Sequence, residues 1–257
     1  MLVTQIASYP SLEGRVVFVT GGGSGIGASI VEHLCAQRAC VAFVDIEPEA
    51  SAALVETLAA RGYETPTFIP CDVRDIPALR GAIAEIRARL GPIRVLINNA
   101  ANDERHSIEA VTPEYWDERF AVNLRHQFFA AQAAAPEMAA AGGGSIINFG
   151  STSWLVGQGG MPAYLSAKAA VAGLTRALAR DLGPMNIRVN CIVPGWIMTE
   201  RQIRLWLTPE GEQELLRRQC LKRKLLPEDI ARVVLFFAAD DSAACTNQSY
   251  VVDGGWV

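Results

Sequence analysis

Short apolar runs alternate along the chain with longer stretches in which apolar positions recur every three or four residues. The short runs fit strands buried on both faces, and the longer stretches fit helices with one apolar face. The predicted strands are Val16–Thr20, Cys40–Asp45, Thr67–Pro70, Val95–Asn98, Ser145–Phe149, Arg188–Val193 and Ser249–Val252. The predicted helices are Gly25–Gln37, Pro48–Arg61, Asp75–Leu90, Pro113–Met138, Ala163–Leu182 and Pro227–Ala239.

The order of these elements predicts the fold class. Apolar strands separated by helices indicate a parallel sheet covered on both faces, and right-handed crossovers make it a doubly wound, Rossmann-like α/β fold. No internal repeat or linker is visible, so residues 1–257 are predicted to form a single domain around seven strands. The least regular stretch, 196–226, follows a strand and is predicted to form a lid over the substrate.

Composition and charge exclude several classes of function. Half of the 257 residues are hydrophobic, enough for one sizeable core, and the net charge of −4 does not suggest nucleic-acid binding. The six cysteines include no Cys-x-x-Cys pair and there are three histidines, so we expect reduced thiols, no metal site and a cytoplasmic protein. Residues 1–11 do not resemble a signal peptide, and no apolar run is long enough to span a membrane.

Tyr164 and Lys168 are the strongest candidates for catalysis. Residues four apart lie on the same face of a helix, and an ammonium about 4 Å from a phenol favours the phenolate by roughly 4 kcal/mol at an effective dielectric of 20. Such a pair would lower the tyrosine pKa by about 3 units and make it a general base near neutral pH. This spacing alone is usually a coincidence, but Ser151, thirteen residues before Tyr164, and other motifs agree with it.

A glycine-rich turn, Thr20–Gly27, lies directly between the first predicted strand and the first helix. Glycines there allow close approach of a pyrophosphate, and the helix N-terminus offers free N–H groups. Asp45 closes the second strand, where a carboxylate accepts bonds from ribose hydroxyls and repels a 2′-phosphate, so we expect NAD rather than NADP. Asp72 closes the third strand; it either contacts an adenine, with Val73 packing on the ring, or caps a helix.

Together these segments resemble the short-chain dehydrogenase/reductase family, over about residues 12–255. The residues that match the family's catalytic asparagine, serine, tyrosine and lysine are Asn123, Ser151, Tyr164 and Lys168. The family's Asn-Asn-Ala-Gly motif is present as residues 98–101, with Ala101 in place of the last glycine. The resemblance and the motifs above assign cofactor binding to Gly21, Ser24, Gly25, Ile26, Asp45, Asp72, Val73, Asn99, Ala100, Tyr164, Lys168, Pro194, Ile197 and Thr199.

The resemblance implies a mechanism. Tyr164 takes the proton of a substrate hydroxyl while hydride passes to the nicotinamide, and Ser151 hydrogen-bonds the reacting oxygen. Lys168 holds the ribose and lowers the tyrosine pKa, helped by the positive charge of NAD⁺. Asn123 positions a water that links Lys168 to solvent. Two competing functions are a secondary-alcohol, polyol or 3-oxoacyl reductase, which Asp45 disfavours, and an NAD-binding regulator without turnover, which the complete catalytic set disfavours.

Several stretches, among them 102–106 and 148–154, are similar to bacterial sugar dehydrogenases of this family, which oxidise an aldose at C1. The residues expected to bind the sugar are Asn102, Ser151, Ser153, Gln158, Tyr164 and Trp196. Trp154 or Trp196 could stack on the sugar, or could equally be packing residues. His106 is expected in a structural polar cluster rather than as a ligand, and Arg105 is a candidate for the same role.

Two further features concern surfaces. A basic cluster at 217–224 could attract an anionic substrate, but nearby glutamates favour a solvated helix face. The family is commonly tetrameric, and the alanine-rich stretches of Pro113–Met138, together with Ala163–Leu182, provide helix faces suited to close packing. We therefore expect a homotetramer that acts on a small sugar, without nucleic-acid or membrane partners.

Overall fold

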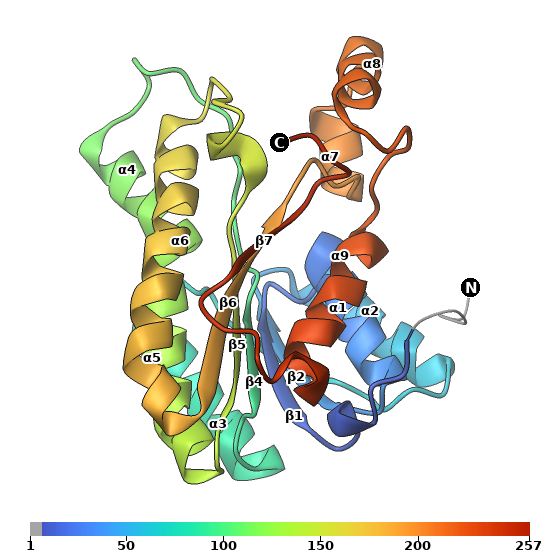
Figure 1. The fold of residues 1–257 in the computed structure, drawn as a ribbon, viewed down its shortest axis with the longest axis vertical. Coiled ribbons are helices and arrows are strands. Elements are labelled where there is room, and N and C mark those ends of the chain that lie inside the picture. The colour runs from blue at the N-terminus through green and yellow to red at the C-terminus, as the bar shows by residue number, and fades with distance from the viewer. Residues whose placement is uncertain (1–6) are drawn as a thin grey trace.

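The computed structural model describes residues 7–257, in which all strands form one parallel sheet (Figure 1). The expectation that no signal peptide is present concerns residues 1–11 and so lies largely outside the described residues. The strands are β1 (Val16–Thr20), β2 (Cys40–Asp45), β3 (Thr67–Pro70), β4 (Val95–Asn98), β5 (Gly144–Phe149), β6 (Ile187–Pro194) and β7 (Ser249–Val252). Their order is β3-β2-β1-β4-β5-β6-β7, which confirms the predicted doubly wound seven-stranded sheet.

Helices cover both faces of the sheet (Figure 1). One layer contains α1 (Gly25–Ala36), α2 (Pro48–Ala60) and α9 (Pro227–Ala238). The other contains α3 (Ile76–Leu90), α4 (Pro113–Phe120), α5 (His126–Ala140) and α6 (Pro162–Leu182). Two large apolar clusters lie between the sheet and these layers. Val17 and Val19 belong to the cluster with α1 and α9, and Phe18 belongs to the other, as the alternation of side chains along a strand requires.

The predicted helix Pro113–Met138 is interrupted. Thr112 caps its start by accepting a bond from Tyr115 N at 3.2 Å, but residues Ala121–Arg125 form a π-helical turn between α4 and α5. Asn123 lies in this turn, and its side chain donates to the backbone oxygen of Arg119 at 2.9 Å. Because a π turn adds one residue to the helical repeat, periodicity alone predicts an uninterrupted helix.

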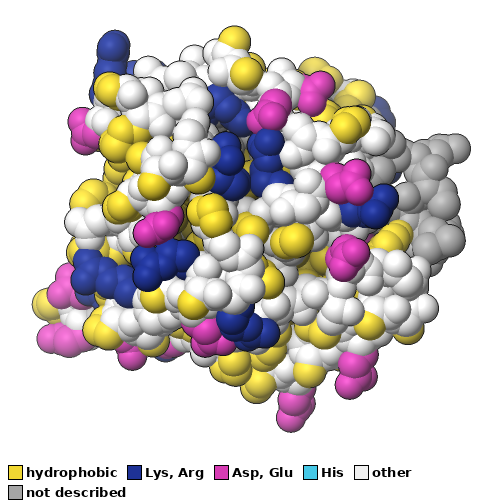
Figure 2. Space-filling view, turned by 90° about the horizontal axis from the view of Figure 1, so that it is seen from below, with side chains coloured by type: hydrophobic (Ala, Val, Ile, Leu, Met, Phe, Trp, Pro, Cys, Tyr) yellow, Lys and Arg dark blue, Asp and Glu magenta, His cyan; other side chains and the backbone are white. Residues whose placement is uncertain are grey.

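The irregular stretch 196–226 contains two short helices, α7 (Glu200–Leu205) and α8 (Pro209–Arg218), which stand above the sheet in Figure 1. At the opposite, lower end of the molecule, Figure 2 shows acidic and basic side chains interspersed with apolar ones. Within residues 7–257, no helix is both long enough and apolar enough to cross a membrane.

Candidate active site

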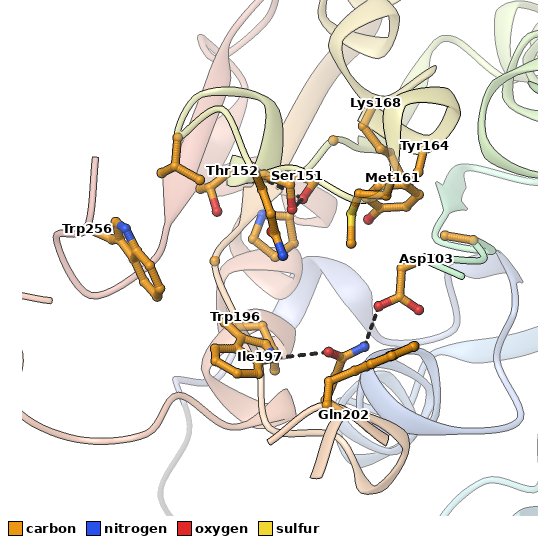
Figure 3. A pocket seen from close by; sticks show the side chains of 18 of the residues that line it. Asp103, Ser151, Thr152, Met161, Tyr164, Lys168, Trp196, Ile197, Gln202 and Trp256 are labelled. Carbon is orange, nitrogen blue, oxygen red and sulfur yellow. Dashed lines mark hydrogen bonds between the residues drawn. The ribbon is translucent and has the colours of Figure 1, made fainter. Parts of the chain in front are cut away.

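A cavity of about 680 Å³ opens at the carboxyl ends of β4, β5 and β6 (Figure 3). Its walls come from the loop after β4, from the segment between β5 and α6, from α6 itself and from the 196–218 stretch. Of the residues predicted from sequence to act as catalysts or bind ligands, it brings together Ile26, Asn99, Ser151, Ser153, Gln158, Tyr164, Lys168, Pro194, Trp196, Ile197 and Thr199.

Helix α6 presents Tyr164 and Lys168 to this cavity. Lys168 is 1 % exposed, and its Nζ donates to the backbone oxygen of Phe149 at 2.8 Å. The same Nζ lies 5.8 Å from the centroid of the Tyr164 ring. The end of β5 therefore holds the ammonium beside the phenol, as the spacing of four residues predicts.

Ser151 lies at the start of a short 3₁₀ turn, Thr152–Trp154. Its Oγ accepts a bond from the backbone N of Ser153 at 3.1 Å and donates to Ser153 Oγ at 2.9 Å. The two hydroxyls therefore form a chain on one wall of the cavity, and Figure 3 shows Ser151 near Tyr164.

The pKa values of the pair depart from the expectation. Burial raises the pKa of Tyr164, the charge of Asp103 raises it further, and a hydrogen bond with Ser151 lowers it. Burial lowers the pKa of Lys168 to about 8. The predicted lowering of the tyrosine pKa by Lys168 is therefore not met by the protein alone, because the cost of burying a phenolate outweighs the attraction.

The side chain of Asn123 is fully engaged with the backbone. Its Oδ1 accepts from Asn102 N at 2.9 Å, and its Nδ2 donates to Asn102 O at 3.1 Å and to Arg119 O. Its backbone oxygen accepts from Gln127 Nε2 at 3.1 Å. Asn123 thus ties the loop after β4 to the π turn; its predicted role in positioning a water is untested.

The glycine loop is shaped for a phosphate group. Gly21 has φ +68°, and a Cβ there would lie 2.7 Å from Ala100 Cα. Asn99 Nδ2 donates to Gly21 O at 2.8 Å, and Ala100 N donates to Thr20 Oγ1 at 3.1 Å. The loop leads into the N-terminus of α1, whose free N–H groups fit a pyrophosphate. The other predicted loop residues, Ser24 and Gly25, lie at this helix start, outside the cavity wall.

Asp45 faces the glycine loop from the end of β2. Its Oδ2 accepts from Gly23 N at 2.8 Å and its Oδ1 from Glu47 N at 3.1 Å. These bonds hold the carboxylate in one position while leaving it further acceptor capacity. The fixed carboxylate beside the phosphate cradle fits an adenosine ribose with free hydroxyls.

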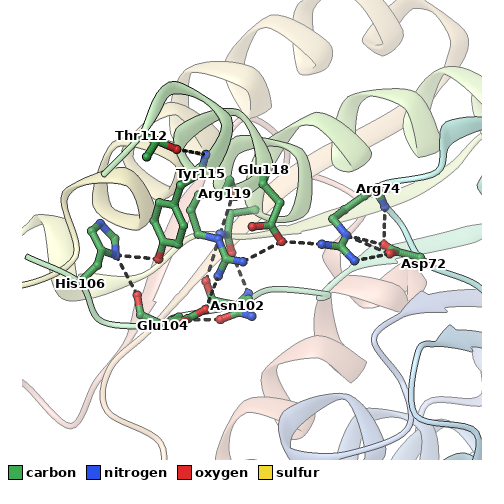
Figure 4. A network of polar contacts seen from close by, with 10 residues as sticks. Asp72, Arg74, Asn102, Glu104, His106, Thr112, Tyr115, Glu118 and Arg119 are labelled. Atoms are coloured by element: carbon green, nitrogen blue, oxygen red, sulfur yellow. Dashed lines mark hydrogen bonds and ion pairs between the residues drawn. The ribbon is translucent and has the colours of Figure 1, made fainter. Parts of the chain in front are cut away.

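Asp72 does not cap a helix; Asp75 does so for α3, accepting from Ala78 N at 2.9 Å. Instead the Asp72 carboxylate accepts hydrogen bonds from the backbone N and the guanidinium of Arg74. These bonds lower the pKa of the carboxyl. Figure 4 shows that the Glu118 carboxylate accepts hydrogen bonds from both Arg74 and the buried Arg119. Because Arg119 also pairs with Glu104 at 3.2 Å, this network links Asp72 to the loop after β4. Val73 is 5 % exposed, and contact of either residue with an adenine is untested.

The substrate predictions are only partly matched by position. Asn102 does not line the cavity, because its backbone pairs with Asn123 and its Oδ1 accepts from Glu104 N at 2.9 Å. Trp154 also lies outside the cavity wall, with 37 % of its surface exposed. Trp196 lines the cavity, and its Nε1 donates to Gln202 Oε1 at 2.9 Å.

His106 belongs to a structural polar cluster, as expected. Its Nδ1 lies 2.9 Å from the Tyr115 hydroxyl, and its Nε2 accepts from Ala163 N, at the start of α6, at 3.4 Å.

Most of the basic side chains at 217–224 are paired: Arg217 and Arg218 with Glu214, Arg223 with Asp229, and Lys224 with Glu212. The solvated-face interpretation of that cluster therefore holds, although Arg218 also reaches the cavity.

Several residues of the cavity were not predicted, among them Asp103, Arg105, Met161, Gln202, Trp206 and Trp256. Asp103 and Arg105 are on the loop after β4, and Gln202 and Trp206 are on or beside α7. No motif marks them, because they meet only when residues about a hundred positions apart fold together. For Asp103 and Arg105 the signal in the sequence was the similarity of the stretch 102–106 to sugar dehydrogenases.

Comparison with known proteins identifies the class. The model of a family described as Enoyl-(Acyl carrier protein) reductase matches residues 21–257. A solved gluconate 5-dehydrogenase from Burkholderia cenocepacia J2315, in complex with NADP and tartrate, has a TM-score of 0.89 and 30% sequence identity, covering 97% of both chains. The chain therefore belongs to the short-chain dehydrogenase/reductase family, whose members use a nicotinamide cofactor.

Two curated relatives within this family are named as sugar dehydrogenases. The chain is 54% identical to "Probable galactose dehydrogenase GalD" of Rhizobium meliloti (strain 1021) over 97% of both sequences. It is 49% identical to D-xylose 1-dehydrogenase of Caulobacter vibrioides over 97% of this chain and 98% of the relative. A solved blue fluorescent protein from a metagenomic library, in complex with NADPH, has a TM-score of 0.88 and 35% identity, covering 96% of this chain and 99% of that one.

Proposed function

We propose that this protein oxidises a neutral aldose at C1 to the lactone, with NAD⁺ as the hydride acceptor. The observation that carries the proposal is the meeting of Ser151, Tyr164 and Lys168 in a cavity walled by amide, hydroxyl and indole groups. Such walls suit a substrate with many hydroxyls, because unpaired buried polar groups would penalise an apolar one. The 54% identity to a protein named as a galactose dehydrogenase supports the same substrate class.

The residues divide the reaction between them. Tyr164 Oη takes the proton of the C1 hydroxyl, Ser151 Oγ hydrogen-bonds the reacting oxygen, and C1 loses its hydrogen with the bonding electrons as the C=O bond forms. The bound nicotinamide supplies the hydride acceptor and a positive charge. Lys168, held by Phe149 O, would bind the ribose and, with that charge, offset the effect of burial on the tyrosine pKa.

The surroundings of the site complete the proposal. Asp45 favours NAD over NADP because a 2′-phosphate would meet its carboxylate. Residues 196–226 would act as a lid, since α7 and α8 supply one wall of the cavity. All six cysteines are free thiols, which suits a cytoplasmic enzyme.

The test is formation of NADH, followed at 340 nm with NAD⁺ or NADP⁺ over aldoses, polyols, secondary alcohols and 3-hydroxyacyl thioesters. NAD⁺-dependent oxidation of D-galactose or D-xylose is the expected result. Activity confined to alcohols or thioesters would contradict the sugar assignment while leaving the catalytic residues in place.

Tyr164→Phe should bind NAD⁺ like the wild type and lose at least about 10³-fold in turnover. Full turnover by this variant would exclude Tyr164 as the base.

A further inference from the structure

Asp103 brings a carboxylate into the cavity beside the catalytic tyrosine. It lies on the loop after β4, lines the cavity, and has a side chain that is 23 % exposed. Figure 3 shows it between Tyr164 and Gln202, with its oxygens in the space that separates α6 from the 196–202 segment. It lines the same cavity as Tyr164 and Lys168, and its negative charge raises the pKa of both side chains.

The position of this carboxylate is fixed from the α7 side. Gln202 Nε2 donates to Asp103 Oδ2 at 2.5 Å, and Trp196 Nε1 holds the other end of the same amide by donating to Gln202 Oε1 at 2.9 Å. A second contact runs in parallel: the Arg105 guanidinium lies 4.4 Å from the centroid of the Trp206 ring. The loop after β4 and α7 therefore hold each other at the mouth of the cavity.

Asp103 has hydrogen-bonding capacity to spare. Its Oδ1 has a single long bond in the described structure, from Arg201 Nε at 3.4 Å, whereas a carboxylate offers about four acceptor sites. An ionised carboxylate accepts but cannot donate, so its complement is a hydroxyl donor. An anionic group at the same place would be repelled.

We propose that Asp103 is a specificity-determining residue that accepts a hydrogen bond from the sugar hydroxyl next to the reacting carbon, at C2. The assignment rests on the proposed oxidation of an aldose at C1. When Tyr164 and Ser151 hold the C1 oxygen, the C2 hydroxyl is its immediate neighbour, and Asp103 is the carboxylate that lies beside Tyr164. Gln202 and Trp196 act as positioning residues, because they hold the Asp103 side chain in place.

The experiment is a double-mutant cycle in which the Asp103 charge and the C2 hydroxyl of the sugar are removed separately and together. We would measure kcat/KM with NAD⁺ for D-galactose, 2-deoxy-D-galactose and the 6-deoxy sugar D-fucose, in the wild type and in Asp103→Asn. A bond to a charged group contributes about tenfold to a hundredfold in kcat/KM. The galactose to 2-deoxygalactose ratio should therefore fall about tenfold or more in Asp103→Asn. The ratio of kcat/KM for galactose to that for fucose should change by less than about twofold, because the C6 hydroxyl that fucose lacks is remote from C1 and C2.

The cycle separates recognition from general damage. Glu109→Gln is the matched control, since it removes a carboxylate from the same loop at an exposed position outside the cavity; it should leave all ratios unchanged. A purely structural role for Asp103 would lower kcat/KM equally on all three sugars and would overturn the assignment. If the wild type oxidised no aldose, the proposed function itself would fail, and the assignment with it.

Discussion

Tyr164 combines two opposing influences on one phenol. Burial and the charge of Asp103 raise its pKa, and a hydrogen bond with Ser151 lowers it. The neighbouring Lys168 is itself buried and has a pKa lowered to about 8. The raised pKa favours the neutral phenol, so the proposed role of Tyr164 as a base would depend on positive charge added beside it, such as that of an oxidised nicotinamide.

This predicts the direction of the pH dependence. Tyr164 accepts a proton only in its deprotonated form, so kcat/KM for sugar oxidation should rise with pH from about 6 and approach a plateau in alkaline solution. Rates at saturating NAD⁺ across this range would show the rise. A profile that falls as pH increases from 6 to 8 would contradict a base of raised pKa.

The proposed preference for NAD⁺ over NADP⁺ depends on one residue, Asp45. Asp45→Asn keeps an acceptor for Gly23 N but removes the charge that a 2′-phosphate would meet. The NADP⁺ to NAD⁺ ratio of kcat/KM should rise by about tenfold to a hundredfold, as expected for losing a repulsion of a few kcal/mol. Glu49→Gln, at the exposed start of α2, is the control and should not change this ratio. An unaltered ratio in Asp45→Asn would show that residues other than Asp45 determine the choice between NAD⁺ and NADP⁺.

At the scale of elements, the strands were predicted almost residue by residue, because strands buried on both faces are uninterrupted apolar runs. The π turn was missed, since nothing in the apolar periodicity of 113–138 marks the added residue. The candidate catalytic and phosphate-binding residues could be named because their motifs are local, and the structure brings Ser151, Tyr164 and Lys168 to one cavity. The pairing of Asp103 with Gln202 could not, because it depends on how two distant loops fold.

The π turn leads directly into a buried histidine with a consequence for stability. His126 is fully buried at the start of α5, and burial lowers its pKa to about 3, with the charge of Lys168 acting in the same direction. The unfolded chain binds this proton near pH 6.5, so the folded state loses roughly 1 kcal/mol per pH unit as pH falls from 6.5 toward 3.

Replacing this histidine tests the effect. Urea unfolding of the wild type and of His126→Asn would be compared at pH 7 and at pH 5. The variant should lose less unfolding free energy between the two pH values, because its buried side chain does not titrate. Equal losses in the two proteins would show that His126 does not set the acid sensitivity.

On the scale of the whole molecule, an apolar groove remains open between the α4–α5 segment and α6. Its wall includes Phe120, Leu124, Phe128, Phe129 and Leu174, and Phe128 is 39 % exposed. We propose that a second copy of the chain covers this groove in a homotetramer. Light scattering at micromolar concentration should give four times the chain mass, and Phe128→Glu should reduce it. A monomeric wild type would refute the proposal.

The contacts between the loop after β4 and α7 also bear on what limits each turnover. The Asp103–Gln202 bond and the Arg105–Trp206 stack must separate for a bulky lactone to leave, if 196–226 acts as a lid. The slow event would then be this separation and not the breaking of the C1–H bond. With sugar deuterated at C1, kcat should be nearly insensitive to the isotope. The variant Gln202→Ala, with one contact removed, should reveal a larger isotope effect on kcat.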